Sequence, residues 1–383
     1  MRRILFFLVL AAVSVLSCKK NDPRNEAARY AVDCDMESAQ PVTLLSDVVD
    51  SYSILPLQSD DLMGTVNRLC ADDSGIYIVS DEKVWAFDMD GRERYCISAK
   101  GRSASEYLEL RGFCLSDRFI AISDTEGQKI LFFNKTDGKH FKTVNVDFYA
   151  DLICYLNDTV LAVSCSGATG PRLVTLNTVD GRVLSRSIDY EDIFSEPVRQ
   201  PFIRLGESLL YKMPFYNDYF EVTDDGIKGK YLTYDFRDYN FNIKGVKPVN
   251  FGIVTLLVDT WGNAHVSHAY NIGSKFVTTF ICQAESEDSY YMMITDTLTH
   301  SKQLIDSESF TDDVTFYDFV IYPQIFDCYD DRLVCVIYPD YWTDTFPGLT
   351  DERKSSPYYQ SALEQYRSLS GNDNPLLVFY HLK

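Results

Sequence analysis

The stretch FDMDGRERYCI, residues 87–97, decides the fold because versions of it recur along the chain. The related stretches are FNKTDGKHFKTVNV (133–146), LNTVDGRVLSRSI (176–188) and, less closely, VTDDGIKGKYLTY (222–234). Their Asp-Gly pairs end at Gly91, Gly138, Gly181 and Gly226, which are 47, 43 and 45 residues apart. Asp-Gly between two β-rich runs predicts a tight turn, since glycine accepts a positive φ at little cost.

Each Asp-Gly turn is preceded by further short runs that are typical of strands. In the first copy these are VNRLCA (66–71), IYIVS (76–80) and VWAFD (84–88). One copy is therefore four short strands joined by tight turns. A four-stranded sheet that repeats every 40 to 50 residues or so is the signature of a β-propeller blade.

The repeats predict an all-β fold, a six-bladed β-propeller with four-stranded blades over residues 46–383. Five blades are expected at 66–98, 110–146, 150–188, 201–236 and about 261–306. The sixth is split: QIFDCY, RLVCVIY and LLVFYHL supply three strands, and DSYSILPL (50–57) supplies the fourth. Closing the ring with a strand from the other end of the chain removes exposed sheet edges.

The N-terminus, MRRILFFLVLAAVSVLSC, predicts export. Two arginines followed by a short apolar run are a secretory signal, too short for a spanning helix. Ser17 directly before Cys18 resembles a bacterial lipobox, so we expect a signal peptide at 1–17, lipidation of Cys18 and a tether over 18–45. The alternative is an ordinary signal peptide cleaved elsewhere. The lipid would anchor the chain in the outer membrane, with the side it faces left open.

The formal charge of −20 excludes nucleic acid as a partner, because binding to phosphates relies on Lys and Arg. We expect a monomer. Cys18 aside, nine cysteines remain, and most sit inside apolar strand-like runs. Small buried side chains are the preferred interpretation. One disulfide, Cys328 with Cys335, stays open as an alternative because the compartment permits it.

The segment GRERYCISAKGRSASEYLEL (91–110) resembles one found in Bacteroidetes six-bladed β-propeller lipoproteins, whose propellers are NHL- or TolB-like. There a Gly-Lys-Gly-Pro-Gly-Glu-Tyr-like motif links blades one and two. The C-terminal NDNPLLVFYHLK is also similar to the end of those proteins, so the resemblance covers nearly the whole mature chain. The sequence departs from the motif at its centre, where Ser103-Ala104-Ser105 stands for Gly-Pro-Gly. The resemblance implies a fold but no activity.

Residues 99–109 are predicted to connect the outer strand of blade one to the inner strand of blade two. The segment enters a strand rather than a helix, which excludes a phosphate-binding loop. We expect Glu106 to bond loop amides and Tyr107 to pack beneath the next blade. The alternative is a ligand site at the axis that uses Arg102, Glu106, Tyr107 and Arg111.

A long insert in the last blade, about 339–375, contains a predicted helix at about 350–371, with Ser356 as N-cap and Gly371 past its end. Its apolar stripe, Tyr359, Leu363, Tyr366 and Leu369, predicts docking on the propeller; the alternative is a lid over the axis. In the stretch PDYWTDTFPG (339–348), Tyr341 and Trp342 are expected at the surface as candidate ligand contacts, together with Phe346.

No pattern in the sequence indicates a particular chemistry. His265-x-x-His268 has metal-like spacing, but residues three apart on a strand face opposite sides. Propellers of lactonase type hold a calcium with Glu, Asn and Asp at the central ends of different blades. Residues of these types exist here, for example Glu106, Asn217 and Asp218, but nothing in their spacing singles them out, so the sequence does not indicate calcium. We therefore predict a module that binds a protein or glycan ligand. The alternative is a metal-dependent hydrolase, lactonase or lyase acting on a glycan or lactone at the axis.

Overall fold

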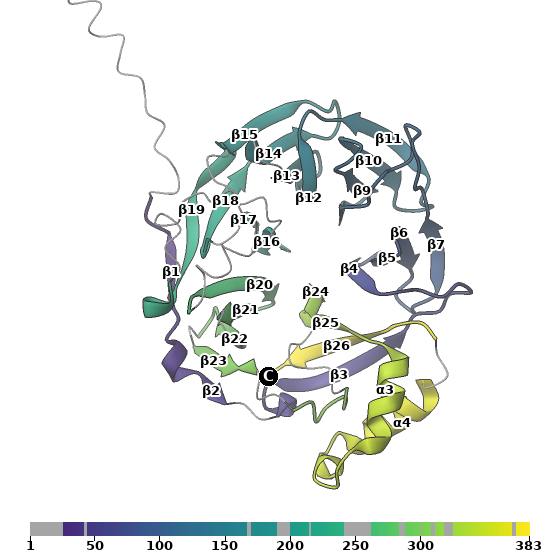
Figure 1. The fold of residues 1–383 in the computed structure, drawn as a ribbon, viewed down its shortest axis with the longest axis vertical. Helices are drawn as coiled ribbons and strands as arrows, with labels where there is room; N and C mark the ends of the chain where they lie inside the picture. The colour runs from purple at the N-terminus through teal and green to yellow at the C-terminus, as the bar shows by residue number, and fades with distance from the viewer. Residues whose placement is uncertain are drawn as a thin grey trace, which may run out of the picture.

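The computed structural model describes residues 26–41, 44–166, 170–189, 200–213, 216–240, 262–282, 288–299, 301–307, 311–317, 325–369 and 373–383. Their strands form six sheets arranged as a closed ring, which Figure 1 views along its central axis. The predicted six-bladed β-propeller is thereby confirmed. The signal segment and Cys18 lie outside the described residues.

The first three blades each consist of four consecutive strands, which pair in chain order from the axis to the rim. Blade one contains β4 (Val66–Asp72), β5 (Gly75–Ser80), β6 (Lys83–Phe87) and β7 (Glu93–Ile97). Blade two contains β8 (Gly112–Leu115), β9 (Phe119–Asp124), β10 (Lys129–Asn134) and β11 (His140–Asn145). Blade three contains β12 (Tyr149–Asn157), β13 (Val160–Ser166), β14 (Pro171–Asn177) and β15 (Val183–Asp189).

Blades four to six follow the same plan. Blade four contains β16 (Phe202–Leu205), β17 (Ser208–Lys212), β18 (Asp218–Thr223) and β19 (Gly226–Asp235). Blade five contains β20 (Ala264–Ile272), β21 (Lys275–Cys282), β22 (Ser289–Asp296) and β23 (Lys302–Asp306). Blade six contains β24 (Ile325–Tyr329), β25 (Arg332–Ile337), β26 (Leu376–Leu382) and, as its outermost strand, β3 (Val49–Pro56).

The ring closes as the sequence predicted. β3 pairs antiparallel with β26, from Pro56 opposite Leu376 to Val49 opposite Leu382. The Asp-Gly turns also form as expected, with Gly91 at φ 80° and Gly181 at φ 75°.

The segment before β3 differs from the expected tether. β1 (Tyr30–Asp33) pairs in parallel with β19, and β2 (Gln40–Pro41) pairs in parallel with β23. Short 3₁₀ turns at Met36–Ser38 and Leu45–Asp47 join these pieces. Part of the segment 18–45 is therefore a belt of added strands along the rims of blades four and five, which covers edges that would otherwise be open.

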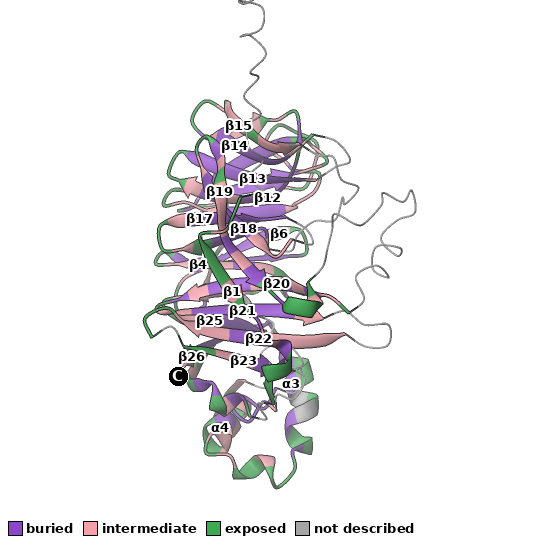
Figure 2. Ribbon diagram, turned by 90° about the vertical axis from the view of Figure 1, so that its left-hand side faces the viewer, coloured by how far each residue is buried: buried purple, intermediate pink, exposed green. Residues whose placement is uncertain are grey.

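The core consists of six apolar clusters, one at each junction between neighbouring blades. The second strands supply continuous buried runs such as Gly75–Ser80, whereas an outer strand such as His140–Asn145 is mostly exposed or half-buried. Figure 2 turns the ring edge on and shows buried strands through its thickness, with exposed residues concentrated in the turns. Among the described residues, no helix combines the length and apolar character that crossing a membrane requires.

The insert in blade six contains two helices, α3 (Pro339–Thr345) and α4 (Tyr359–Leu369), joined through 3₁₀ turns at Phe346–Gly348 and Arg353–Ser355. Ser356 accepts a hydrogen bond from the amide of Tyr358, just before α4 begins. Gly371 lies outside the described residues. Figure 1 places both helices beside the outer strand β3, away from the centre of the ring. The apolar stripe of α4 packs on the cluster between blades five and six, which confirms docking and is contrary to a lid over the axis.

Candidate functional site at the connector face

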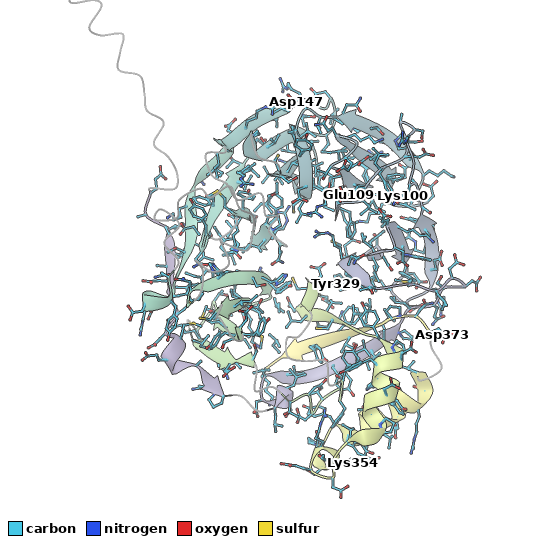
Figure 3. The ribbon with its side chains drawn as sticks, in the orientation of Figure 1. Lys100, Glu109, Asp147, Tyr329, Lys354 and Asp373 are labelled. Carbon is cyan, nitrogen blue, oxygen red and sulfur yellow. The ribbon has the colours of Figure 1, made fainter. Side chains whose placement is uncertain are left out.

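The two faces of the ring carry different kinds of loop. Because neighbouring strands in a blade are antiparallel, the first-to-second and third-to-fourth turns lie on one face, here called the turn face. The second-to-third turns and the blade-to-blade connectors lie on the opposite connector face. Figure 3 shows Glu109, which precedes β8, and Tyr329, which ends β24, at the border of the central opening. The expected connectors at 189–197 and 237–260 lie mostly outside the described residues.

The connector between blades one and two, residues 98–111, is held in one conformation by its own backbone. The amide of Tyr107 donates to the carbonyl of Ala99 at 2.9 Å, and the amide of Gly101 donates to the carbonyl of Tyr107 at 2.9 Å. Glu106 accepts the amide of Ser103 at 2.8 Å, and its carboxylate folds over Gly101, where a Cβ would collide with it. These hydrogen bonds hold the pKa of Glu106 below its usual value.

Residues of blade two fix the same connector from below. The buried carboxylate of Asp124 accepts the amides of Leu108 at 2.9 Å and Glu109 at 3.2 Å. The ammonium of Lys129 donates to the carbonyl of Ser103 at 3.1 Å. Thr143 donates to the carbonyl of Ala104 at 2.6 Å. The loop is therefore rigid although Ser103-Ala104-Ser105 replaces the glycine-rich centre of the similar motif.

Tyr107 is fully buried in the cluster between blades one and two. Its hydroxyl donates to the carbonyl of Glu82 at 2.6 Å. The structural roles predicted for Glu106 and Tyr107 are confirmed by these contacts, which leave Tyr107 no surface to offer a ligand.

Arg102 stands at the tip of this rigid connector. Its side chain is exposed, and its guanidinium forms no ion pair or hydrogen bond with another described residue. Every other cation named on this connector is bound: Lys100 pairs with Glu82, and Arg111 pairs with Asp151. Arg102 is thus an exposed charge on a fixed backbone, and no described residue of the protein pairs with it.

Arg111 lies where the connector reaches the axis. Its Nε atom donates to Asp151 on β12 at 2.5 Å, and its guanidinium is 4.0 Å from Glu109. Arg68 on β4 is a near neighbour of the same pair: burial lowers the pKa of Arg68, Asp151 raises it, and Arg111 lowers it. Arg111 of blade two therefore pairs with a buried carboxylate of blade three, and Arg68 of blade one lies within electrostatic reach of both. Asp124 and Asp151 were not singled out in the sequence, where each is an ordinary acid at a strand end.

The innermost strands also carry three thiols and one carboxyl whose pKa values are raised by burial. Cys70, Cys114 and Cys154 come from the innermost strands of blades one to three, and burial raises the pKa of each thiol. Asp327 on β24 faces the same region, and burial raises the pKa of its carboxyl to about 7. All nine described cysteines are free, as expected of small buried side chains. The Cys328–Cys335 disulfide is not formed, because the register sets Leu333 opposite Cys328.

Within the described ranges, no three His, Cys, Asp or Glu side chains are placed to hold a metal ion. The acids and amides considered for calcium have structural partners: Asn217 bonds the backbone of Ala264 and Val266, and Asp218 pairs with Lys230. No observation on these residues favours the metal-dependent enzyme.

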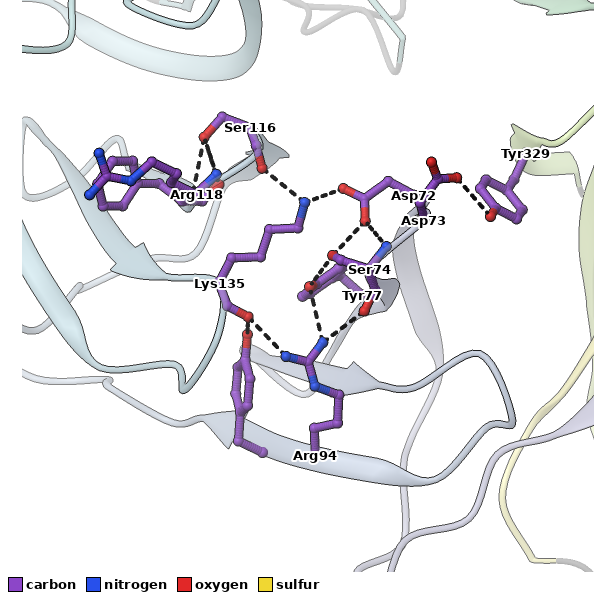
Figure 4. Close-up of polar contacts among 11 residues, drawn as sticks. Asp72, Asp73, Ser74, Tyr77, Arg94, Ser116, Arg118, Lys135 and Tyr329 are labelled. Carbon is purple, nitrogen blue, oxygen red and sulfur yellow. Dashed lines mark hydrogen bonds and ion pairs between the residues drawn. The ribbon is translucent and has the colours of Figure 1, made fainter.

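The turn face carries a polar network that joins three blades (Figure 4). The buried ammonium of Lys135 bonds Asp72 and the carbonyl of Ser116. Arg94 donates to the carbonyls of Ser74, Lys135 and Thr136, and Tyr329 of blade six donates to Asp73. Because these charged groups are bound by contacts within and between blades, we interpret the network as structural rather than as a ligand site.

The surface position expected for Trp342 and Phe346 is wrong. Trp342 is only 1% exposed, and its indole N–H donates to the carbonyl of Thr315 at 3.2 Å. α3 turns Trp342 and Phe346, four residues apart, toward the ring, where both pack on Tyr366 of α4. Tyr341 is 37% exposed and packs edge-on against Tyr317. Since α3 lies outside the ring, beside β3, neither Tyr341 nor Trp342 joins Arg102 (Figure 1). The contacts of Ser103 with β10 and of Ala104 with β11 set Arg102 over the outer strands of blade two rather than at the axis, where it was expected.

Comparisons with known proteins agree with this architecture. The family model described as Domain of unknown function (DUF4934) matches residues 29–381. A crystal structure of a putative exported protein from Bacteroides fragilis is similar, with a TM-score of 0.71, 16% identity, and coverage of 92% of this chain and 99% of that one. No curated protein matches the sequence.

Two further structures are less similar. The WD40 repeats of RRP9 give a TM-score of 0.43 at 10% identity, covering 86% of this chain and 97% of that one. A protein of unknown function from Bacteroides caccae gives a TM-score of 0.39 at 11% identity, and the match covers 63% of this chain and 82% of that one. Likeness at this level carries no argument.

Proposed function

This chain belongs to the family described as Domain of unknown function (DUF4934), and on that premise we propose that it is an exported, lipid-anchored β-propeller that binds a ligand on its connector face. The observation that carries the proposal is Arg102, an exposed guanidinium that no described residue binds, on a connector held by blade two. Binding residues are disproportionately found on loops that a rigid scaffold positions. A preorganised group also loses less conformational entropy when the ligand arrives.

The charge of Arg102 indicates an acidic ligand, a protein segment or a glycan. A guanidinium can grip a carboxylate through two parallel hydrogen bonds, which a flexible ammonium cannot match. Arg111 and Arg68 lie at the axial end of the same connector and extend the positive region inward. Asp151 partly neutralises them, so Arg102 is the stronger candidate for direct contact.

The test requires a ligand, found by binding the protein to arrays of acidic glycans and peptides. Arg102→Ala is expected to weaken binding at least about tenfold, the effect of losing one charge-assisted hydrogen-bonded contact. The matched control is Arg92→Ala in the third-to-fourth turn of blade one, on the turn face, where Arg92 pairs with Asp90. If Arg92→Ala loses binding while Arg102→Ala retains it, the ligand binds the other face.

Export and lipidation rest on the first 18 residues. The exported character given to the Bacteroides fragilis protein supports the same compartment. Labelling with a fatty-acid analogue in a bacterial host tests the anchor: wild type is expected to carry label in the membrane fraction. A Cys18→Ser variant that still carries label would refute lipidation at this cysteine.

A further inference from the structure

A lysine is buried at the junction of blades four and five without a negative partner. Lys212 is the last residue of β17, at the connector face, and is 4% exposed. Its ammonium donates to the carbonyl of Val266 on β20 at 2.6 Å. No carboxylate of the described residues forms an ion pair with Lys212. A buried ammonium with a single carbonyl acceptor has two N–H donors left over, and such a charge is costly to keep.

A second unsatisfied group lies beside it. Tyr219 on β18 is directly opposite Lys212 in the antiparallel register, so the two side chains project from the same side of blade four. Tyr219 is 0% exposed, and its hydroxyl has no hydrogen-bond partner. Its ring packs with Tyr234 in the cluster between blades four and five. A buried ammonium and a buried phenol hydroxyl therefore come from opposite positions on the same side of blade four, and neither spends all its protons on described residues.

The titratable side chain that interacts with the ammonium of Lys212, His265, is neutral at pH 7 and supplies no negative charge. His265 is the second residue of β20, and its pKa falls to about 4 through burial and, next, through the nearby ammonium of Lys212. The imidazole is therefore neutral near pH 7. Burial alone lowers the pKa of Lys212, to about 8, so the ammonium still dominates at neutral pH.

In the other two buried lysines of the described chain, a nearby carboxylate compensates the charge of the ammonium. Lys135, 5% exposed, is bound by the carboxylate of Asp72 and the carbonyl of Ser116. Lys129, 8% exposed, lies 3.8 Å from Asp124 and donates to Ser103. Lys212 is as deeply buried as these two, but no acid of the described residues pairs with it. What distinguishes Lys212 from Lys129 and Lys135 in this part of the chain is the lack of a negative acceptor.

We propose that Lys212 and Tyr219 form a binding site for a small monocarboxylate, whose oxygens accept protons from the ammonium and the phenol hydroxyl. One ammonium balances a single negative charge, whereas a doubly charged phosphate would leave net charge buried. The site lies directly before the turn that follows β17, on the connector face. It is formed by blades four and five rather than by the connector that carries Arg102, so either proposal can fail without the other.

The experiment measures the thermal unfolding midpoint of the full-length protein at neutral pH against increasing acetate or propionate, with sodium chloride holding the ionic strength constant. Wild type is expected to show a saturable rise, since a ligand that binds only the folded state stabilises it. Lys212→Met is expected to lose the rise, and without carboxylate to melt above wild type because an uncompensated buried charge is gone. Tyr219→Phe is expected to bind at least about tenfold more weakly.

Lys135→Met is the matched control, a buried lysine replaced in the same way. It should melt below wild type, because Asp72 loses its partner, and still respond to acetate. The proposal is overturned if neither carboxylate gives a saturable rise in wild type, or if Lys212→Met responds as wild type does. A response to inorganic phosphate as strong as that to acetate would overturn the carboxylate assignment. If Lys212→Met does not fold, an unchanged affinity in Tyr219→Phe refutes the site.

Discussion

The buried carboxylate of Asp124 is the residue on which the shape of the candidate connector depends most. It accepts three amides, those of Leu108 at 2.9 Å, Glu109 at 3.2 Å and Gly127 at 2.8 Å, and it lies 3.8 Å from the ammonium of Lys129. Replacing Asp124 with Ala removes the acceptor from all three amides and leaves Lys129 without its only carboxylate in the described chain. We therefore expect Asp124→Ala to destabilise the fold and to loosen residues 98–111.

The magnitude follows from the type of contact. Hydrogen bonds to a charged group contribute about 1.5–3 kcal/mol each, and water can reach the amides of Leu108 and Glu109 once the connector moves. Removing one partner of a buried ion pair costs about 3–5 kcal/mol, and we expect Asp124→Ala to fall in that range. Asp124→Asn keeps one acceptor oxygen, so its cost should be about half as large.

Equilibrium unfolding in urea measures these differences, provided that the slope against urea is unchanged between variants. Amide hydrogen exchange gives a second readout, since Leu108 and Glu109 should exchange faster in Asp124→Ala while amides of β13 do not. Asp117→Ala, an exposed acid in the first turn of the same blade, is the control and should match wild type. A loss below about 1 kcal/mol in Asp124→Ala would refute the reasoning, because ordinary surface substitutions cost that little.

Three further outcomes test the ring and its axis. A chain starting at Asp60 lacks β3 and should melt well below one starting at Leu44, which lacks β1 and β2 but retains β3; equal midpoints would refute strand closure. Tyr107→Phe removes the hydroxyl that donates to the carbonyl of Glu82 and should cost about 1 kcal/mol in the same urea assay. The carboxyl of Asp327 has a pKa of about 7 in the folded chain against 3.8 as its ordinary value, so the folded state binds more protons between these values and stability should fall as pH rises from about 4 to 7. Asp327→Asn should remove that part of the pH dependence, and a variant as pH-sensitive as wild type would contradict it.

The fold was predictable because each blade is a local unit with its own turn signal. The Asp-Gly pairs mark turns with positive φ at intervals of 43 to 47 residues, and the buried runs between them have the length of strands. Even the split blade could be predicted, since three strands at the C-terminus lacked a fourth. β1 and β2 could not be, because a four-residue and a two-residue strand that pair in parallel with distant partners carry no periodic signal.

The error at Trp342 has an equally physical origin. The aromatic side chains of PDYWTDTFPG were expected at the surface, and no helix was assigned to these residues. Pro339 in fact occupies the first turn of α3, where proline costs little. On that helix Trp342 and Phe346 are one turn apart and share a face. A helical interpretation of the same letters would have predicted their burial.

The candidate site at Lys212 could not be predicted from the sequence, because it depends on contacts that only the structure shows. In the letters SLLYK, Lys212 is an ordinary polar residue at the end of a strand, where a lysine normally reaches solvent. Two structural facts make Lys212 a candidate binding residue. The strand register places Tyr219, whose hydroxyl is unsatisfied, opposite it, and the junction with blade five brings the carbonyl of Val266 to its ammonium. The chain carries 20 more negative than positive charges, yet no acid in its described part pairs with this ammonium. Within the described residues, this ammonium is the one buried lysine that lacks a carboxylate partner, and that is the observation the carboxylate titration tests.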